Sequence, residues 1–452
     1  MYYKRLIDKY LLEWKEKANH KPLLLRGARQ VGKSSAVKHL GETFKYYIEI
    51  NFEKQKDTKR LFEELSDIHT IAERIGVLFS TPIIENETLI FLDEIQSCPD
   101  AIKSLWKWKE DFPNLHVIAA GSLLEFALKE LSSFGVGRVT SYYVYPFSFD
   151  EFLMANGKEN WIEQKQKANH NSPVFEALHN ELVQLFRTYL LVGGMPACVA
   201  QWVETHNYQL CAEEQEDICN SYYDDFSKYA NKIDIKILRN TLQSVVVQTG
   251  KKFVYGHVEG GYRTEEIKTA LQMLLDAGLI KRISHTAANG IPLGAETNDK
   301  FRKYLFLDSG MLLRLMDLEL GGSKQMTEQI LTSVASDLVN KGSLTELVCG
   351  WELVKYSSPK VQPELYYWEN LKNGTSAEVD YILVRDMKIL PLEVKSGTSG
   401  KMKSLRNFMQ SKNLTNGLRC SLENFSQLTI EDETNNHTSY IDIVPLYALS
   451  NL

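Results

Sequence analysis

The sequence predicts an α/β protein with several domains, and three observations carry this prediction. Before residue 156, short apolar runs typical of strands alternate with segments long enough for helices. From about residue 172 to residue 276, apolar residues recur at three- and four-residue spacing, the periodicity of a buried helix face. After residue 342, one helical segment leads into short strands of alternating pattern.

The first part of the chain is expected to form a mostly parallel sheet flanked by helices. Strands that alternate with helices are typical of such sheets, because a crossover between parallel strands needs a connection of helix length. The expected strands are Pro22–Arg26, Tyr46–Asn51, Thr88–Asp93 and Leu115–Ala120. Polar stretches at 156–172, 287–300 and 321–328 indicate seams. We therefore expect domains at 1–155, 156–230, 231–320 and 335–452.

The third of these segments has the element order of a winged helix. Helices are expected at 232–250 and 263–277, followed by a strand at 278–283 with a partner at 303–307. A winged helix that reads DNA carries cations on its second helix. Here Arg263 and Lys268 are opposed by Glu265, Glu266 and Asp276. We therefore favour a packing or partner-binding module over a DNA reader.

The composition is that of an ordinary globular chain. Of the 452 residues, 44% are hydrophobic and 24% are charged, and the formal net charge is −6. These values exclude wholesale disorder, and the negative charge argues against a protein that coats nucleic acid by bulk charge. The six cysteines include no CxxC pair and the ten histidines no HxxxH or HExxH. Reduced, buried thiols are therefore expected rather than a zinc site.

Neither a leader nor a membrane span is expected. The first residues lack the apolar core of a signal peptide, and no stretch approaches 18 uninterrupted apolar residues. We therefore expect a soluble cytoplasmic protein.

Residues 27–34 match the phosphate-binding pattern GxxxxGK[ST] in full. An apolar run, Leu23–Leu25, leads into the loop and an amphipathic segment follows it. Glycines let backbone N–H groups wrap the phosphates, and the helix that follows presents its positive dipole end to them. The predicted ligand is ATP, with Lys33 at its β- and γ-phosphates and Ser34 on Mg²⁺. The residues expected to contact the nucleotide are Gly27, Ala28, Arg29, Gln30, Val31, Gly32, Lys33, Ser34 and Ser35.

The second half of this site is expected where two later strands end. The apolar run Leu89–Leu92 delivers Asp93 and Glu94 to the carboxyl edge of the sheet, where ligands of parallel sheets bind. Asp93 is expected to hold Mg²⁺ through water, and Glu94 to orient and polarise the attacking water. Ser122 follows the next strand, either as a polar sensor of the γ-phosphate or as a cap of the helix expected from Leu123.

These motifs together resemble a known family, the prokaryotic AAA-superfamily ATPases that pair an N-terminal P-loop domain with a C-terminal domain of uncharacterised function. Where the family usually has Thr-Gly-Ser, this chain has Ala120-Gly-Ser122. The resemblance implies that Arg138 approaches the γ-phosphate, in cis or from a neighbouring subunit; a surface arginine is the other interpretation. The matching segments are Leu25–Ser34, Leu92–Gln96, Ala120–Ser122, Gly137–Arg138, Tyr145–Phe152, Leu191–Pro196, Phe306–Met311 and Glu378–Asp380 with Glu393–Lys395.

The tail contains a second group of acidic residues. Asp380 and Glu393 flank an expected hairpin, and Glu393 and Lys395 share a strand face because they are two residues apart. Two carboxylates and a lysine can hold Mg²⁺ and stabilise a metal-bound hydroxide that attacks a phosphodiester. The arrangement resembles the PD-(D/E)XK nuclease fold, without its proline and with Glu346 as the helix glutamate. The other interpretation is cross-strand ion pairing on an exposed hairpin.

Two functions therefore remain open. The first is an ATPase whose nuclease-like tail acts on nucleic acid, with DNA favoured over RNA. The second is an ATP-dependent switch or interaction protein, whose tail keeps the fold as an inactive partner-binding module. The intact acids and lysine favour the first, and the acidic net charge favours the second. Assembly into a homo-oligomer is compatible with both.

Overall fold

The computed structural model describes residues 1–63, 67–122, 124–130, 137–229, 232–316, 341–370, 377–397, 402–432 and 437–452. The expected seam at 321–328 and the helix start at Leu123 lie outside the described residues. The chain divides into two units, which are treated separately below. The first contains residues 1–147, 276–278 and 357–362, and the second contains the remainder.

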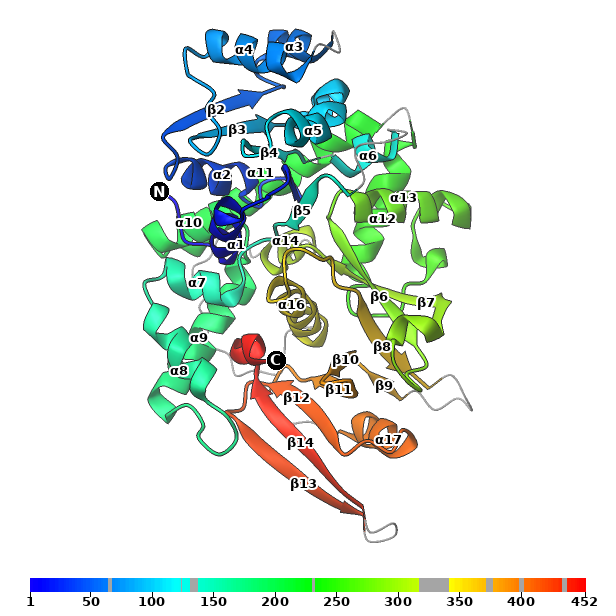
Figure 1. Cartoon of the computed structure of the whole chain (residues 1–452). Helices are drawn as coiled ribbons and strands as arrows, with labels where there is room; N and C mark the ends of the chain where they lie inside the picture. Colours follow the sequence, from blue (N-terminus) through cyan, green and yellow to red (C-terminus); the bar gives the residue numbers. More distant parts are fainter. Residues whose placement is uncertain are drawn as a thin grey trace. The chain divides into compact units, whose positions relative to one another are not determined.

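The first unit is built on the parallel sheet that the sequence predicts. Its five strands run in the order β2-β3-β4-β1-β5, and every neighbouring pair is parallel. Helices α3 and α4 lie on one side of β2 and β3, and α2 lies on the other (Figure 1). The strands are β1 Leu23–Arg26, β2 Tyr46–Asn51, β3 Thr88–Asp93, β4 His116–Ala120 and β5 Thr140–Tyr143.

Apolar side chains on both faces of the central strands hold this unit together. All six residues of β3 and all five of β4 are buried. Ile90 and Leu92 pack in one cluster with Ile102, Leu105 and Trp108 of α5. The helices are α1 Leu6–Glu16, α2 Lys33–Gly41, α3 Arg60–Glu63, α4 Ile68–Leu78, α5 Pro99–Asp111 and α6 Leu124–Glu130, with short 3₁₀ turns η1 Lys56–Lys59 and η2 Ile95–Ser97.

The second unit begins with a helical layer. Ser148 caps α7 in a capping box with Glu151, and the second unit begins at Ser148. The domain boundary expected at residue 155 stays a prediction. Its helices are α7 Phe149–Ala155, α8 Glu159–Lys167, α9 Glu176–Val192, α10 Pro196–Thr205, α11 Tyr208–Asp225, α12 Ile235–Val247, α13 Thr264–Asp276, α14 Ser309–Leu315, α16 Lys341–Lys355 and α17 Lys403–Ser411. Its 3₁₀ turns are η3 Phe226–Tyr229, η4 Tyr255–His257, η5 Leu293–Glu296 and η6 Leu446–Asn451.

Buried polar contacts tie α16, which opens the tail, to the helical layer. Glu352 accepts hydrogen bonds from the backbone N–H of Phe149 at 2.9 Å and from the hydroxyl of Tyr189 at 2.8 Å. Lys165 and Asp150, both nearly inaccessible to solvent, form an ion pair at 2.7 Å. A buried charge that lost its partner would be costly, so these contacts fix how the helices meet.

The expected winged-helix segment has its elements in the predicted order, but its sheet does not end there. Strands β6 Ile280–Thr286 and β7 Thr297–Phe306 form an antiparallel hairpin. The other edge of β6 pairs in parallel with β8 Leu365–Glu369, and β8 pairs with β9 Glu378–Val379. One four-stranded sheet therefore contains strands from both of the expected domains 231–320 and 335–452, whose boundary stays a prediction. The winged-helix similarity itself stays a prediction.

A second sheet completes the tail, in the order β10-β11-β12-β14-β13. The hairpin expected around residues 381–392 is present, with Tyr381 opposite Leu392. Helix α17 packs on this part through Leu405, Phe408 and Met409, which share a core with Ile441. The strands are β10 Tyr381–Arg385, β11 Lys388–Val394, β12 Asn416–Ser421, β13 Ser426–Asp432 and β14 His437–Pro445.

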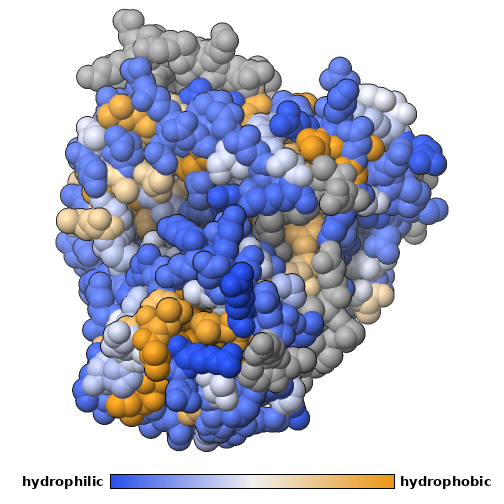
Figure 2. All heavy atoms as spheres, turned by 90° about the horizontal axis from the view of Figure 1, so that it is seen from above, coloured by the Kyte–Doolittle hydropathy of each residue, from blue (hydrophilic) through white to orange (hydrophobic). Residues whose placement is uncertain are grey.

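The cysteines are buried, as the sequence predicts, and the face of the molecule drawn in Figure 2 is mostly hydrophilic. All six cysteines are buried and none forms a disulfide. Among the described residues, no helix is both long and apolar enough to cross a lipid bilayer. Hydrophilic residues cover most of the face drawn in Figure 2, and hydrophobic side chains gather there in a few small areas.

Two buried histidines link α1 to the sheet of the first unit. The rings of His20 and His116 stack with their centroids 3.9 Å apart. The Nε2 atom of His116 lies 3.0 Å from the carbonyl oxygen of Lys15. Burial lowers the pKa of His116 from 6.5 to about 4. The folded state therefore binds a proton at this ring less readily than the unfolded state does.

Stability should consequently fall as the pH drops from about 6.5 toward 4. Between pH 7 and pH 5, we expect the wild-type chain to lose about 2 kcal/mol more of its free energy of unfolding than His116→Phe does. Urea unfolding followed by tryptophan fluorescence at both pH values measures this difference. Equal losses in the two proteins would show that His116 does not carry the pH dependence.

Candidate functional site

The loop between β1 and α2 has the backbone that a phosphate cradle needs. Gly27 has φ +141°, and a Cβ there would collide with the carbonyl oxygen of Val144. Gly32 has φ +93° and precedes the first residue of α2, and no side chain caps this helix start. The first N–H groups of α2 are thus left for an anion. Between the glycines, Ala28 and Val31 are buried and anchor the loop, whereas Gln30 and the following Ser35 are exposed.

Lys33 is held inside this loop by its own backbone. Its ammonium donates to the carbonyl oxygens of Gly27 at 2.9 Å and Ala28 at 2.6 Å. Burial lowers the pKa of Lys33 to about 8, although the charges of Glu94 and Asp93 raise it. A phosphate would supply the missing negative charge, so the site is electrostatically prepared for an anion.

Asp93 lies where the predicted Mg²⁺ site requires it. Its Oδ1 accepts a hydrogen bond from Ser34 Oγ at 3.1 Å, and its Oδ2 accepts one from Asn51 Nδ2 at 2.9 Å. Asn51 stands opposite Asp93 in the β2–β3 pair. Burial and the neighbouring Glu94 raise the pKa of Asp93. Ser34 and Asp93 are thus in contact, and Asn51, which no motif in the sequence selects, joins them.

Glu94 adopts a left-handed backbone with φ +50°, unusual for a residue with a side chain and typical of functional sites. Its Oε2 accepts hydrogen bonds from Gln96 Nε2 at 2.7 Å and Ser122 Oγ at 3.4 Å. Gly121 passes so close that a Cβ would collide with Gln96 Oε1. Ser122 therefore contacts the Glu94 carboxylate. Gln96 also holds this carboxylate, although the sequence motifs do not select it. The sequence signal that could have selected Gln96 is its position. Gln96 and Ser122 follow β3 and β4, two neighbouring parallel strands whose carboxyl ends meet.

Arg138 lies at the other edge of the sheet. Leu23 pairs with Thr140 in the parallel β1–β5 pair, so Arg138 precedes the start of β5 while the loop follows the end of β1. By this register Arg138 is level with Lys21, six residues before Gly27, which is about 20 Å of extended chain. The Arg138 guanidinium instead pairs with Glu110 at 3.0 Å and covers the ring of Trp106. In this unit Arg138 is a surface arginine, and its action on the γ-phosphate, in cis or on a neighbouring copy, stays a prediction.

In the second unit, the predicted acids gather around a lysine that the sequence analysis did not select. One carboxylate oxygen from each of Glu346, Glu378 and Asp380 lies within 4.8 Å of the others. Lys303 of β7 donates to Glu346 Oε1 at 2.8 Å and also bonds Glu378 Oε1. Glu346 therefore lies beside Asp380, but its carboxylate is paired with Lys303, and its role as a metal ligand stays a prediction. Glu378, two residues before Asp380, is an acid of this group that the sequence pattern does not select.

The other predicted residues border this group. Asp380 Oδ2 accepts the backbone N–H of Val394 at 2.7 Å, and Lys395 bonds Glu393 Oε1 at 2.5 Å. Burial raises the pKa of Asp380, raises that of Glu346 to about 8, and raises that of Glu393 to about 7, to which the charge of Asp380 adds. Burial alone would lower the pKa of Lys303. The charges of Glu346, Glu378 and Asp380 outweigh burial, so the pKa of Lys303 lies above its usual value.

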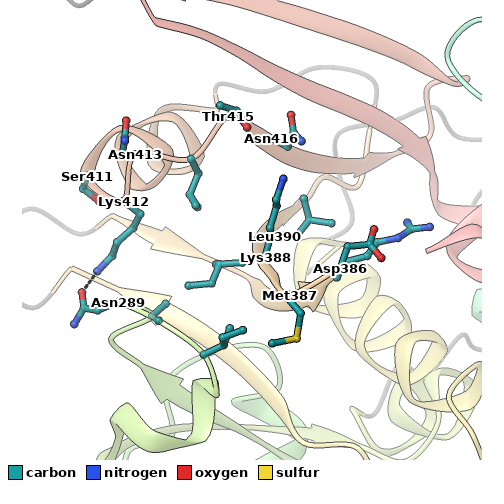
Figure 3. A pocket seen from close by; sticks show the side chains of 16 residues that line it. Asn289, Asp386, Met387, Lys388, Leu390, Ser411, Lys412, Asn413, Thr415 and Asn416 are labelled. Carbon is teal, nitrogen blue, oxygen red and sulfur yellow. Dashed lines mark hydrogen bonds between the residues drawn. The ribbon is translucent and has the colours of Figure 1, made fainter.

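An open pocket of about 800 Å³ lies at the far end of the same hairpin. It lies between the β10–β11 turn, the loop after β6 and the end of α17, and Lys412 reaches across it to Asn289 (Figure 3). Arg385, Lys388 and Lys412 line it with one acid, Asp386. Five strand residues separate this turn from Asp380, about 16 Å. The pocket therefore contains no predicted site residue.

Comparison with known proteins gives a described family for the first domain and families of unknown function for most of the remaining chain. Residues 19–153 match a family model described as an AAA domain. Residues 183–322 match a domain of unknown function (DUF8612), and residues 341–449 match another (DUF4143). The first segment is therefore an AAA-type P-loop domain. A search of curated proteins gives no match.

Solved structures give distant similarities. The Walker-type ATPase PABY2304 of Pyrococcus abyssi is 14% identical with a TM-score of 0.44, covering 70% of this chain and 96% of that one. The Aeropyrum pernix Orc1 protein in complex with DNA is 11% identical with a TM-score of 0.31, covering 73% and 92%. The S. cerevisiae Hsp104–ADP complex is 13% identical with a TM-score of 0.28, covering 61% and 38%.

The placement of Arg138 is testable in solution. At protein concentrations where the chain is a single copy, we expect Arg138→Ala to keep ATP affinity and turnover within about twofold of wild type, because the arginine lies an estimated ~20 Å from its own loop. Lys107→Ala is the matched control, since this cation lies on the same Trp106 ring. Steady-state turnover with light scattering measures both. A large loss in the single-copy regime would contradict the placement, whereas a loss confined to high concentration indicates action on a neighbour.

Proposed function

We propose that this chain binds ATP with Mg²⁺ and slowly hydrolyses it in the AAA-type domain. The observation that carries the proposal is the hydrogen bond that Ser34 Oγ donates to Asp93 Oδ1 at 3.1 Å, beside the buried Lys33. A hydroxyl and a carboxylate are the oxygen donors that Mg²⁺ prefers, so the residues present fit this ion. When bound, Mg²⁺ neutralises charge on the β- and γ-phosphates.

Lys33 and Glu94 have different roles in the proposed reaction. Lys33 exchanges its two backbone carbonyl partners for phosphate oxygens, which restores full charge to an ammonium whose pKa burial has lowered. Glu94 orients and polarises a water, and the hydrogen bonds from Gln96 and Ser122 hold its carboxylate in place. Arg138 from a neighbouring copy would add charge only in a homo-oligomer.

Two substitutions separate binding from turnover. Lys33→Ala should weaken ATP affinity by about tenfold or more, because it removes a charge-assisted contact to phosphate. Glu94→Gln should keep ATP affinity and lower turnover by about 100-fold, because an amide polarises water poorly. Calorimetric titration and phosphate release measure the two effects.

The exposed Glu73 of α4, changed to Gln, is the matched control for charge. Unchanged turnover in Glu94→Gln would show that another residue polarises the attacking water. Unchanged affinity in Lys33→Ala would contradict nucleotide binding by the loop.

A second proposed activity belongs to the tail, namely metal-dependent cleavage of nucleic acid, with DNA favoured over RNA. Its support is the group of three carboxylates from one helix and one strand end, with Glu393 and Lys395 on the next strand. The residues fit a divalent cation because the donors are all carboxylate oxygens. The alternative is a partner-binding module without catalysis, which the ion pairs of Lys303 favour.

A cleavage assay decides between them. With millimolar Mg²⁺ or Mn²⁺, we expect wild-type protein to cut DNA and Asp380→Ala to lose that activity, since it removes a buried carboxylate at the centre of the group. Glu431→Ala on β13 is the control, because Glu431 is exposed. Absence of cleavage of both DNA and RNA by the wild type would leave the partner-binding module.

A further inference from the structure

Lys303 is an unusual member of the acidic group in the tail. Its side chain is fully buried, and it comes from β7, far from the other members along the chain. Its ammonium bonds Glu346 Oε1 at 2.8 Å and Glu378 Oε1, and it lies 5.1 Å from the centre of the Tyr367 ring. A lysine with all of its length enclosed is stable only when its charge is matched by neighbouring acids.

The charges around Lys303 are not balanced. When all of them are ionised, the carboxylates of Glu346, Glu378, Asp380 and Glu393 and the ammonium groups of Lys303 and Lys395 sum to a formal charge of −2. Burial raises the pKa of several of these acids, as described above. A buried group of side chains with excess negative charge attracts a further cation, or it depends for its stability on the cation that it already contains.

A separate observation shows that the group is incompletely satisfied. Glu393 is only 6% exposed, and its Oε2 has no hydrogen-bond partner among the described residues. Buried carboxylate oxygens are nearly always paired, so an orphaned one points to a missing donor or ion. Its other oxygen already bonds Lys395.

From this geometry we propose that Lys303 is an internal cation that competes with a divalent metal ion for the carboxylates of Glu346 and Glu378. The inference rests on the metal-dependent activity proposed for the tail. An ammonium and a metal ion cannot share the same two oxygens, because their charges would repel across a few ångströms in a buried site. The chain as described therefore has low metal affinity at this group, and the group becomes a metal site when the lysine side chain leaves it.

The sheet limits how that change can occur. Lys303 lies on β7, which is joined through β6 and β8 to β9, the strand of Glu378. Because these strands are hydrogen-bonded to one another, their backbones keep their spacing. The motion is then confined to the side chain of Lys303, and Glu378, which is 37% exposed, is the carboxylate that a metal ion reaches from solvent.

Removing the charge of Lys303 tests the competition. Lys303→Met keeps most of the length of the side chain and takes the formal charge of the group from −2 to −3. We expect the nucleotide-free full chain with this substitution to bind Mn²⁺ at least tenfold more tightly than wild type, measured by the loss of the free Mn²⁺ signal in electron paramagnetic resonance. Lys303→Arg, which keeps the charge, should remain weak.

The site of binding is checked with a matched double variant. Lys303→Met combined with Asp380→Asn should lose the gained affinity, whereas Mn²⁺ bound elsewhere would be unaffected. ATP turnover, measured in parallel, should be the same in Lys303→Met as in wild type. Failure of the P-loop proposal and failure of this one therefore give different results.

Equal or weaker Mn²⁺ affinity in Lys303→Met would overturn the proposal, because Lys303 would then be a structural or positioning group. Lys303→Gln serves if the methionine variant does not fold, since it is also neutral. Mn²⁺ should raise the thermal midpoint of the neutral variants more than that of wild type, because binding to the folded state stabilises it. A larger rise in wild type would also overturn it.

Discussion

The hydrogen bond between Ser34 and Asp93 depends on a single constraint, which is the order of strands in the parallel sheet. Ser34 follows β1 and Asp93 ends β3, and β4 lies between these two strands. Since all five strands point the same way, the loop, both acids and Ser122 emerge at one edge. Asn51 arrives there for the same reason, because β2 is in register with β3. The hydrogen bonds at the site are thus a consequence of topology more than of any one loop.

The same constraint removes Arg138 from the site of its own chain. A residue that precedes a parallel strand lies at the opposite edge from one that follows it, whatever its distance in sequence. The Gly-Arg pair resembles a known pattern in the sequence, but resemblance does not indicate at which end of β5 the arginine falls. Pairing with Glu110 and Trp106 gives it a structural role in this unit.

The sequence predicted those features that are local or periodic. The parallel sheet, the phosphate-binding loop and the β10–β11 hairpin each follow from residues close together in the chain. Lys303 could not be predicted, because it meets Glu346 and Glu378 across 43 and 75 residues. That meeting depends on β6 pairing with β8, and no turn or period in the sequence specifies such a pairing. For the same reason, the sequence did not predict that strands on both sides of the expected boundary between residues 320 and 335 share one sheet.

The shared sheet β7-β6-β8-β9 also bears on how the second unit can be divided. Strand β6 uses one edge for β7 and the other for β8, so it has neighbours on both sides. A chain cut after residue 340 would leave the β8 side of β6 with unpaired backbone groups, the kind of edge that recruits other strands and aggregates. It would also expose the ammonium of Lys303 without its acids. The segment matched by DUF4143 therefore completes a sheet that the β6–β7 hairpin begins, and a cut between the two would divide that sheet.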